Sequence, residues 1–570
     1  MCLTCGCNAE PSKVERIKEG SRALRGTIPE DLASDSPTFE GANTQILKFH
    51  GVYQQEDRDR RKEARKRGLD RHYQMMVRTR IPGGRVSPEG YLAHDRIADE
   101  WGNGTVRITT RQDFQLHGVL KGDLWASIHA INESLMTTLG GCGDQVRNVM
   151  CCPAPLQDRL RVELRAALPG VVDGLTPTTE AYHQIWVDGE VVADYEPAPD
   201  PLYGTRYLPR KFKVGLAVDG DNCVDVYSHD LGLVAMRGLD GGLAGFDVLV
   251  GGGLGRTHNK PDTYPAVGQL LAFVATEHLV ETARAVVAVQ RDFGNRSERR
   301  YARLKYVLAE RGLDWFREQV QARVPFELAA PWPLRWEPLD DHLGWHEQGD
   351  GRLFYGLFVE NGRIQDTGEA RLKTALRRLV EEHRPVLWMT AQQNLIVGGV
   401  EPERREAVER LLTDHGVALT EHVSQTVRNS MACPAIPTCG LAVAESERVL
   451  PALSRRIEGL VAELGLAGER ISFRMTGCPN GCARPYLGDV GFVGTTLGKY
   501  DVYLGGDFVG TRLNTLFAHN VPLDEIPALL RGPLAAFAGE REPEEGFGDW
   551  CERAGIAALR ERFAAEGATA

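Results

Sequence analysis

The chain has 570 residues and a formal net charge of -11, so it is too long for one hydrophobic core and we expect roughly three or four domains. The acidic balance argues against nucleic acid or an acidic membrane surface as the partner. The N-terminus lacks an apolar signal segment, and charged residues interrupt the longest apolar stretch, 270–290. These features predict a cytoplasmic protein without a membrane span.

Few local patterns stand out along the chain before its cysteine-rich region. Cys2, Cys5 and Cys7 could bind a metal, but thiols at a chain terminus more often have no structural role. The charge-dense stretch 57–68 is typical of a solvated helix face or arm. Near the C-terminal end, apolar residues at three- and four-residue spacing predict a packed amphipathic helix, namely Leu453, Ile457, Leu460, Val461 and Leu464.

Four pairs of segments recur in the same order, which indicates an internal duplication. TRQDFQLHGV from Thr110 aligns with TAQQNLIVGG from Thr390 at an offset of 280, and VRNVMCCPA from Val146 aligns with VRNSMACPA from Val427 at 281. Downstream, HDLGLV and 245–256 resemble GDVGFVG and 499–512. We therefore predict an α+β (mixed α/β) fold with pseudo-two-fold symmetry, in which each half supplies a smaller domain and then a larger mixed-sheet domain.

Domain boundaries follow from this duplication and from segments rich in Pro and Gly. The N-terminal extension, expected to wrap the core, is 1–65. The smaller half-domains are 66–150 and 336–422. The larger repeat domains are 151–335 and 423–570.

The two copies differ in the residues that carry chemistry. Basic groups occur in the first copy, where Arg80 lies opposite Phe358 and Arg111 opposite Ala391 in this alignment. Thiols occur in the second, because Cys152 is the first-half cysteine that answers Cys433, whereas the other second-half cysteines of the motif have no cysteine counterpart: Cys439, Cys478 and Cys482. This division predicts one composite site at the interface of the halves.

Four cysteines come from two short loops rich in Gly and Pro. Cys433 and Cys439 lie in MACPAIPTC, and Cys478 and Cys482 lie in TGCPNGCARP. Four thiolates that converge from tight turns can hold an iron-sulfur cluster, which is the reading we favour. A structural zinc site and unliganded core cysteines are the alternatives, although the five-residue spacer fits zinc poorly. The other cysteines are expected to be small buried residues: Cys151, Cys152, Cys223 and Cys551.

Basic residues gather in the first half. Each one alone could be a surface or salt-bridge residue. Brought together they would repel one another unless an anion lay among them. The set therefore predicts a site for an oxyanion or an anionic cofactor, and it comprises Arg78, Arg80, Arg107, Arg111, Arg147, Arg210, Lys211 and Lys213.

Ten ordered motifs resemble the siroheme and 4Fe-4S sulfite and nitrite reductases, nearly from end to end. They include KFHGVYQQEDRD, TTRQDFQLHG, YLPRKFK, QRDFGNRSERR, NSMACPAIPTC and TGCPNGC. The resemblance implies ferredoxin-like smaller domains. It implies that Cys433, Cys439, Cys478 and Cys482 hold a 4Fe-4S cluster, and that Cys482 also ligates the siroheme iron.

The resemblance also assigns roles to the basic residues. It implies that the anion site is lined by Arg78, Arg147, Lys211 and Lys213. It further implies that siroheme is held or framed by Arg107, Arg111, Gln115, His117 and Arg303, together with Asn480 of TGCPNGC. Arginine can fix the oxyanion, whereas lysine is the better proton donor.

The expected activity is the six-electron reduction of sulfite to sulfide, because the Lys-x-Lys of KFK resembles the sulfite enzymes. Nitrite reduction is the alternative within the family. A non-catalytic iron-sulfur carrier or a zinc-stabilised scaffold is the alternative of another class. Electrons must come from a separate ferredoxin or flavoprotein subunit, with a slight preference for ferredoxin. Cys142 matches a cysteine that some relatives bond to a tyrosine, for which Tyr53 is the candidate here.

Overall fold

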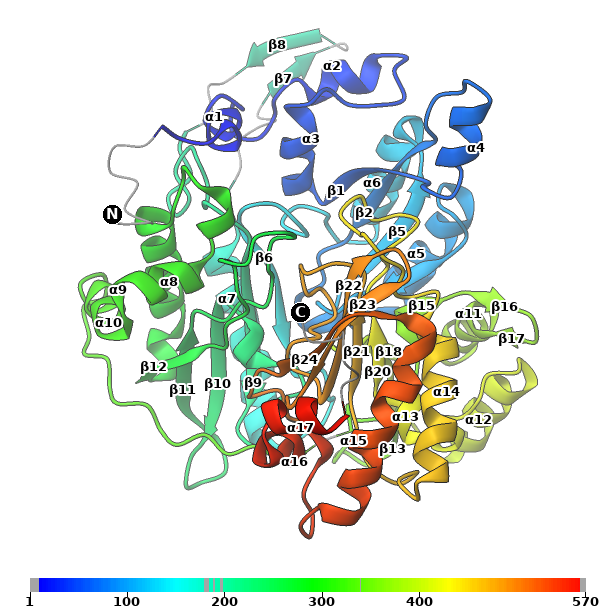
Figure 1. Cartoon of the computed structure of the whole chain (residues 1–570). Coiled ribbons are helices and arrows are strands. Elements are labelled where there is room, and N and C mark those ends of the chain that lie inside the picture. Colours follow the sequence, from blue (N-terminus) through cyan, green and yellow to red (C-terminus); the bar gives the residue numbers. More distant parts are fainter. Residues whose placement is uncertain (1–9, 179–183, 188–189, 195–197, 339, 564–570) are drawn as a thin grey trace.

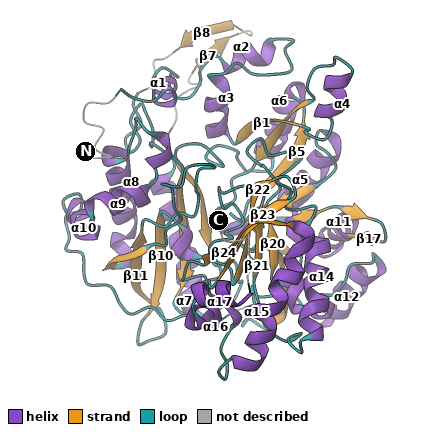
Figure 2. Ribbon diagram, in the orientation of Figure 1, coloured by secondary structure: helices purple, strands orange, loops and turns teal. Residues whose placement is uncertain are grey.

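The computed structural model describes residues 10–178, 184–187, 190–194, 198–338 and 340–563. Strands occupy the middle of the molecule and most helices lie toward its outside (Figure 2). The described strands form four five-stranded sheets, and two two-stranded ribbons flank them: β7 (Gln184–Val187) with β8 (Glu190–Asp194), and β16 (Asp366–Thr367) with β17 (Ala370–Arg371). The mixed α and β composition confirms the predicted fold class.

Two of the sheets are antiparallel and are here called the first and second small sheets. The first has the order β1 (Val52–Glu56), β2 (Tyr73–Arg78), β5 (Phe114–Val119), β4 (Val106–Ile108) and β15 (Arg363–Ile364). The second has the order β13 (Gly344–Glu347), β14 (Leu353–Leu357), β19 (Leu395–Val400), β18 (Val386–Met389) and β3 (Arg85–Val86).

The small sheets exchange their last strands. β15 comes from the second half and pairs with β4, so that Ile364 lies opposite Val106. β3 comes from the first half and pairs with β18, so that Val86 lies opposite Leu387. Each sheet is therefore completed by hydrogen bonds from the other half, which is the pseudo-two-fold arrangement that the duplication predicts.

The two large sheets share a mixed topology. The first large sheet has the order β12 (Gln269–Val274), β11 (Leu243–Val250), β10 (Leu231–Arg237), β9 (Phe212–Val218) and β6 (Val146–Cys151). The second has the order β20 (Ser430–Ala432), β21 (Phe473–Thr476), β22 (Val490–Thr496), β23 (Lys499–Leu504) and β24 (Thr515–Pro522). Taken in chain order, from β6 in the first sheet and from β20 in the second, each sheet has two parallel pairings and then two antiparallel ones.

The strand registers correct the sequence alignment of the small domains by one residue. Thr109 accepts hydrogen bonds from the backbone of Arg111 and Asp113, and Thr390 does the same for Gln392 and Asn394. Thr109 is therefore equivalent to Thr390, at an offset of 281 rather than 280. Arg111 lies opposite Gln392, not Ala391, because only hydrogen-bond geometry distinguishes two adjacent threonines.

The registers also correct the comparison of the cysteines. Val214 pairs with Leu231 in the first large sheet, and Phe473 pairs with Val490 in the second. The two connecting segments have equal length, so Cys223, nine residues after Val214, corresponds to Cys482, nine residues after Phe473. Cys482 thus has a cysteine counterpart in the first half, contrary to the prediction.

Helices cover the outer faces of the sheets. In the first half they are α1 (Lys13–Glu19), α2 (Ile28–Ala33), α3 (Asn43–Ile46), α4 (Arg61–Lys66), α5 (Pro88–Glu100), α6 (Leu124–Glu133), α7 (Arg159–Leu175), α8 (Leu279–Phe293), α9 (Leu304–Arg311) and α10 (Leu313–Gln321). In the second they are α11 (Leu372–His383), α12 (Arg405–Asp414), α13 (Gln425–Arg428), α14 (Leu450–Glu463), α15 (Ile526–Glu540), α16 (Phe547–Ala554) and α17 (Ile556–Phe563). Among these described helices, none combines the length and the apolarity that crossing a bilayer requires.

The predicted amphipathic helix is α14, which packs beside α15 against the second large sheet (Figure 1). Its buried residues include Leu453, Ile457, Leu460 and Val461, which recur on one face as the sequence predicts, and Leu464 is the C-cap residue that follows the helix. Pro451 occupies the first turn, where its missing N–H costs no helix hydrogen bond.

The hydrophobic core is divided at the functional interface. One apolar cluster extends from Leu24 to Val417 and joins both small domains to the first large sheet, whereas a second cluster, from Ala432 to Leu559, belongs to the second large sheet. The domain boundaries stay predictions. Strand pairing crosses two of these boundaries. β1, in the predicted extension, pairs with β2 of the first small domain, and β6, which lies almost entirely before residue 151, pairs with β9 of the first large domain.

A buried ion network holds the two large domains together. Asp225 accepts hydrogen bonds from Arg474, at 2.8 Å, and from Arg484. Asp225 and Arg484 hold equivalent positions in the two repeats, so their contact lies at the pseudo-two-fold axis. All three side chains are at least nine-tenths buried.

Removing this carboxylate should destabilise the protein strongly. We expect Asp225→Asn to lower the unfolding free energy by about 3–5 kcal/mol, because two buried guanidinium groups lose their counter-charge. Urea denaturation measures the change. The control is Arg531→Ala, which breaks the exposed Arg531–Glu463 pair and should leave the unfolding free energy nearly unchanged. Equal effects of the two variants would contradict the assigned role of Asp225.

Candidate active site between the two halves

The four predicted cluster cysteines lie on two loops that leave adjacent parallel strands. Cys433 directly follows β20, and Cys478 follows β21 after one glycine. The backbone N–H of Cys433 donates to Met475 O at 3.2 Å, and that of Gly477 donates to Cys433 Sγ at 3.4 Å. The parallel pairing of β20 with β21 therefore brings the two cysteine loops together.

First-half residues hold both loops in place. Arg58 donates to the carbonyl oxygens of Cys439 and Ala442 at 3.0 and 2.7 Å. Thr110 donates to Cys482 O at 2.9 Å, and the backbone N–H of Arg256 donates to Pro479 O at 2.8 Å. The shape of the thiol site thus depends on the half that supplies no cysteine to it.

The four thiols lie in one electrostatic neighbourhood. Burial raises the pKa of Cys433, and Cys482, Cys478 and Cys439 raise it further. Burial and the Cys482 thiolate likewise raise the pKa of Cys478, to about 12. Thiolates that oppose one another's ionisation need a metal centre among them to be stable together. The set thus fits the donor requirement of a 4Fe-4S cluster.

Cys482 differs from the other three cysteines in its exposure. Cys433 and Cys478 are buried and Cys439 is partly buried, whereas Cys482 is exposed. The Asn480 side-chain amide donates to Cys478 Sγ at 3.4 Å, which places Asn480 beside the thiol site. An exposed fourth thiol can contact a further group outside the cluster.

The four residues predicted to bind the anion come from three strands of the first half. Arg78 ends β2, Arg147 lies near the start of β6, and Lys211 and Lys213 flank the first residue of β9. Each of the four keeps part of its surface accessible. Their side chains are therefore largely, but not fully, enclosed by the protein.

These cations influence one another strongly. Burial lowers the pKa of Lys211 to about 7, with contributions from Arg147, Arg303 and Arg210. Burial lowers the pKa of Lys213 well below its usual range, with contributions from Lys211, Arg111 and Arg303. In both cases Cys482 acts in the opposite direction. The cations and the fourth cysteine therefore influence one another electrostatically, and the composite site itself stays a prediction.

Several of the predicted siroheme residues already have partners within the protein, and Arg107 and Arg303 have the strongest. Arg107 lies 3.2 Å from Glu447 and donates to the carbonyl oxygens of Asn361 and Ala432. Arg303 makes two hydrogen bonds to Asp230, at 3.0 and 2.8 Å. In this structure both guanidinium groups support the walls of the site.

Other predicted siroheme residues present buried polar atoms without a hydrogen bond. Both ring nitrogens of His117 and Nε of Arg111 are of this kind, although Arg111 Nη2 donates to the carbonyl oxygens of Asn148 and Val214. Gln115 donates to Met76 Sδ at 3.4 Å. Burial lowers the pKa of His117 well below its usual range, so the imidazole is neutral. Buried donors without partners fit a polar, anionic cofactor such as siroheme, which would supply the missing acceptors.

Tyr53, Cys142 and Arg147 form a small group at the edge of the pocket. Arg147 donates to the Tyr53 hydroxyl at 3.5 Å, and Cys142 is fully buried. Burial raises the pKa of Tyr53, and Cys142 raises it further, while Arg147 lowers it. The two residues of the predicted bond are thus neighbours, and the bond itself stays a prediction.

The sequence analysis missed the contacts of Thr110 and Arg256 with the cysteine loops, and it also missed Arg58 and Lys48. Arg58 belongs to the charge-dense stretch that was expected to be a solvated face or arm, yet it holds a cysteine loop. Lys48 belongs to the pocket, because burial and the charges of Arg299, Arg210 and Arg147 lower its pKa to about 8. The sequence offered one indication of this role, because Lys48 lies in the same motif as Tyr53, KFHGVYQQ. Cys2, Cys5 and Cys7 lie outside the described residues.

Comparisons with known proteins agree with this geometry. A family described as the nitrite and sulphite reductase 4Fe-4S domain matches residues 172–328 and 424–568, and the nitrite/sulfite reductase ferredoxin-like half domain matches 67–134 and 346–415. Each description matches the chain twice, once in each half. These repeated matches agree with the internal duplication of the chain.

Relatives match over nearly the whole chain. The sulfite reductase (NADPH) hemoprotein beta-component of Staphylococcus saprophyticus is 46% identical over 546 residues, which cover 95% of this chain and 96% of the relative. That of Geobacillus thermodenitrificans is 45% identical over 552 residues, with 96% of each covered. The solved structure of the Mycobacterium tuberculosis NirA protein shares the fold, with a TM-score of 0.77, 23% identity and coverage of 98% and 99%. The chain belongs to the nitrite and sulphite reductase 4Fe-4S family.

Proposed function

We propose that this chain reduces sulfite to sulfide at a siroheme that is coupled to a 4Fe-4S cluster. The observation that carries the proposal is the electrostatic influence of Cys482 on Lys211 and Lys213, since it relates a proposed cluster ligand to the group of cations. The names of the relatives support sulfite as the substrate. Nitrite is the second candidate, because the same cations can bind it.

The residues of this chain have distinct tasks in the proposal. Cys433, Cys439, Cys478 and Cys482 would hold the cluster, with Cys482 shared with the siroheme iron. Arg111, Gln115, His117 and Asn480 would frame the siroheme, while Arg107 and Arg303 fix the walls. When bound, these cofactors supply electrons and a binding position for sulfur.

Protons must reach the oxygen atoms of sulfite as they leave as water. Arg78 and Arg147 would fix the oxyanion by charge-assisted hydrogen bonds, since guanidinium groups stay protonated. Lys211 would donate protons, because burial lowers the pKa of its ammonium group to about 7 and such a group transfers its proton readily near neutral pH. Lys213 would share this task, because a bound oxyanion favours the charged form of a neighbouring amine. Loss of either lysine would slow proton delivery and leave cofactor binding intact.

The electron donor is a separate protein in this proposal. The relatives are named as beta-components of an NADPH-dependent enzyme, so the slight preference for ferredoxin is not supported. We propose a flavoprotein subunit as the donor.

The direct test uses the purified holoprotein and reduced methyl viologen, which replaces the physiological donor. We expect siroheme absorption bands that sulfite perturbs, and sulfide as the product. The specificity constant for sulfite should exceed that for nitrite. Iron without siroheme bands would indicate an electron carrier, and a larger constant for nitrite would reverse the order of the two substrates.

Lys213→Ala tests proton delivery. We expect kcat with sulfite to fall about 10²-fold or more, the range for loss of a general acid, while the cofactor absorption stays unchanged. Steady-state kinetics and the absorption spectrum measure this split. The matched control is Lys499→Ala, which removes an exposed lysine on β23. Normal turnover by Lys213→Ala would show that Lys213 does not deliver protons.

In contrast, Cys482→Ser should change the absorption spectrum of both centres, the siroheme and the cluster.

The bond between Tyr53 and Cys142 can be tested by peptide mapping. If the bond forms, mass spectrometry of the digested protein should recover one linked species two hydrogen masses lighter than the two peptides together. Tyr53→Phe should release the Cys142 peptide in its free form. Recovery of two separate peptides from the unsubstituted protein would contradict the bond.

A further inference from the structure

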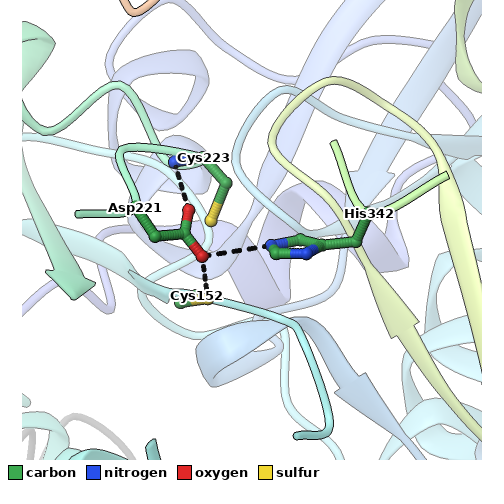
Figure 3. A group of neighbouring side chains, drawn as sticks. All are labelled: Cys152, Asp221, Cys223 and His342. Atoms are coloured by element: carbon green, nitrogen blue, oxygen red, sulfur yellow. Dashed lines mark hydrogen bonds and ion pairs between the residues drawn. The ribbon is translucent and has the colours of Figure 1, made fainter. Parts of the chain in front are cut away.

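Four buried side chains converge at a second place, away from the cluster cysteines. They are Cys152, Asp221, Cys223 and His342, and Figure 3 shows their polar ends pointing toward one another. One ligand atom from each, two thiol sulfurs, a carboxylate oxygen and an imidazole nitrogen, lies within 4.8 Å of all the others. We propose that these four residues bind one zinc ion, which ties the two halves of the chain together.

Each ligand has a fixed backbone origin. Cys152 directly follows β6, and Asp221 and Cys223 lie in the segment between β9 and β10. His342 comes from the second half, two residues before β13. A bound ion would therefore connect the first large sheet to the second small sheet. Structural zinc sites contribute directly to folding energy in this way.

The distances fit a tetrahedral ion. Zinc bonds of about 2.0–2.3 Å to nitrogen, oxygen and sulfur place neighbouring ligand atoms roughly 3.3–3.8 Å apart. Cys152 Sγ lies 3.3 Å from Asp221 Oδ2, and His342 Nε2 lies 3.2 Å from the same oxygen. Small outward shifts of these atoms would admit the ion. The mixed set of two thiols, imidazole and carboxylate suits zinc.

The imidazole of His342 is directed at the other three side chains. Its Nε2 is buried and has no hydrogen bond of acceptable geometry, and its partner in this structure is the ion pair with the Asp221 carboxylate. Buried polar atoms normally have a partner, and a metal ion is the kind of partner that an imidazole nitrogen between thiols and a carboxylate can take.

The charges also balance with a divalent ion. Two thiolates and one carboxylate carry three negative charges, so a zinc complex with neutral His342 has a net charge of minus one. Arg161 lies 3.0 Å from Asp221 Oδ2 and 3.1 Å from Asp158, and it provides the compensating charge. A charged group that orients a ligating carboxylate is typical of metal sites.

The site occupies the pseudo-symmetric place of the cluster. Cys152 corresponds to Cys433, and Cys223 corresponds to Cys482 by the strand registers. By the same offsets, Asp158 and Asp219 stand where the other two cluster cysteines would be. Two thiols are too few for a cysteine-held 4Fe-4S cluster. With Asp221 and His342, they make a complete set for a single ion.

Metal analysis tests the proposal independently of activity. Protein purified with zinc in the medium should contain about one zinc per chain besides its iron, with zinc bonded to two sulfurs at about 2.3 Å and to nitrogen and oxygen at about 2.0–2.2 Å in X-ray absorption. Cys223→Ser combined with His342→Gln should reduce zinc at least tenfold. Iron content and siroheme absorption should stay unchanged, which separates this test from that of the proposed function.

Cys151→Ala is the matched control, because Cys151 is the buried neighbour of Cys152 and lies outside the group of four. It should keep its zinc. The proposal is overturned if the unsubstituted protein neither contains zinc nor takes it up after dialysis against zinc chloride. Zinc retention by the double variant, or a Cys152–Cys223 disulfide found by mass spectrometry in protein purified with a thiol reductant, also overturns it.

Discussion

The exchange of strands between the two small sheets is the constraint on which the rest of the structure depends. β3 and β15 each leave their own half and complete the sheet of the other, so separation of the halves would expose two sets of backbone hydrogen-bonding groups. β4, which receives β15, also carries Arg107, whose side chain donates to Ala432 just before Cys433. The exchange therefore aligns the cation-bearing strands with the cysteine-bearing strands.

The two parts of the site are each electrostatically unfavourable alone. Buried thiols raise one another's pKa, and the pocket cations Lys48, Lys211 and Lys213 have lowered pKa values. An iron-sulfur cluster would supply positive charge to the thiolates, and an anionic cofactor with its substrate would supply negative charge to the cations. The duplicated fold places the thiols and the cations at one interface, where the cluster would stabilise the thiolates and the anionic cofactor would stabilise the cations.

Periodicity and residue type were sufficient to predict the fold class, the duplication and the buried face of α14. The resemblance to a known family, not periodicity, implied that Cys482 and the lysines belong to one site. The sequence analysis failed where only the pairing of strands identifies which residues of the two halves are equivalent. Two adjacent threonines gave a register wrong by one residue, and the different offsets of the two strands concealed the equivalence of Cys223 and Cys482. The convergence of His342 on Cys152 leaves no spacing signal, since nearly two hundred residues separate them. Arg58 looked like one more charge in a solvated stretch.

Iron-edge anomalous diffraction from crystals of the holoprotein tests the central claim most directly. The account predicts one compact group of iron atoms within bonding distance of the sulfurs of Cys433, Cys439, Cys478 and Cys482. It predicts a further iron on the side of Cys482 that faces Lys211 and Lys213. Iron density confined to another part of the molecule, or a cluster with no further iron beside Cys482, would contradict the account.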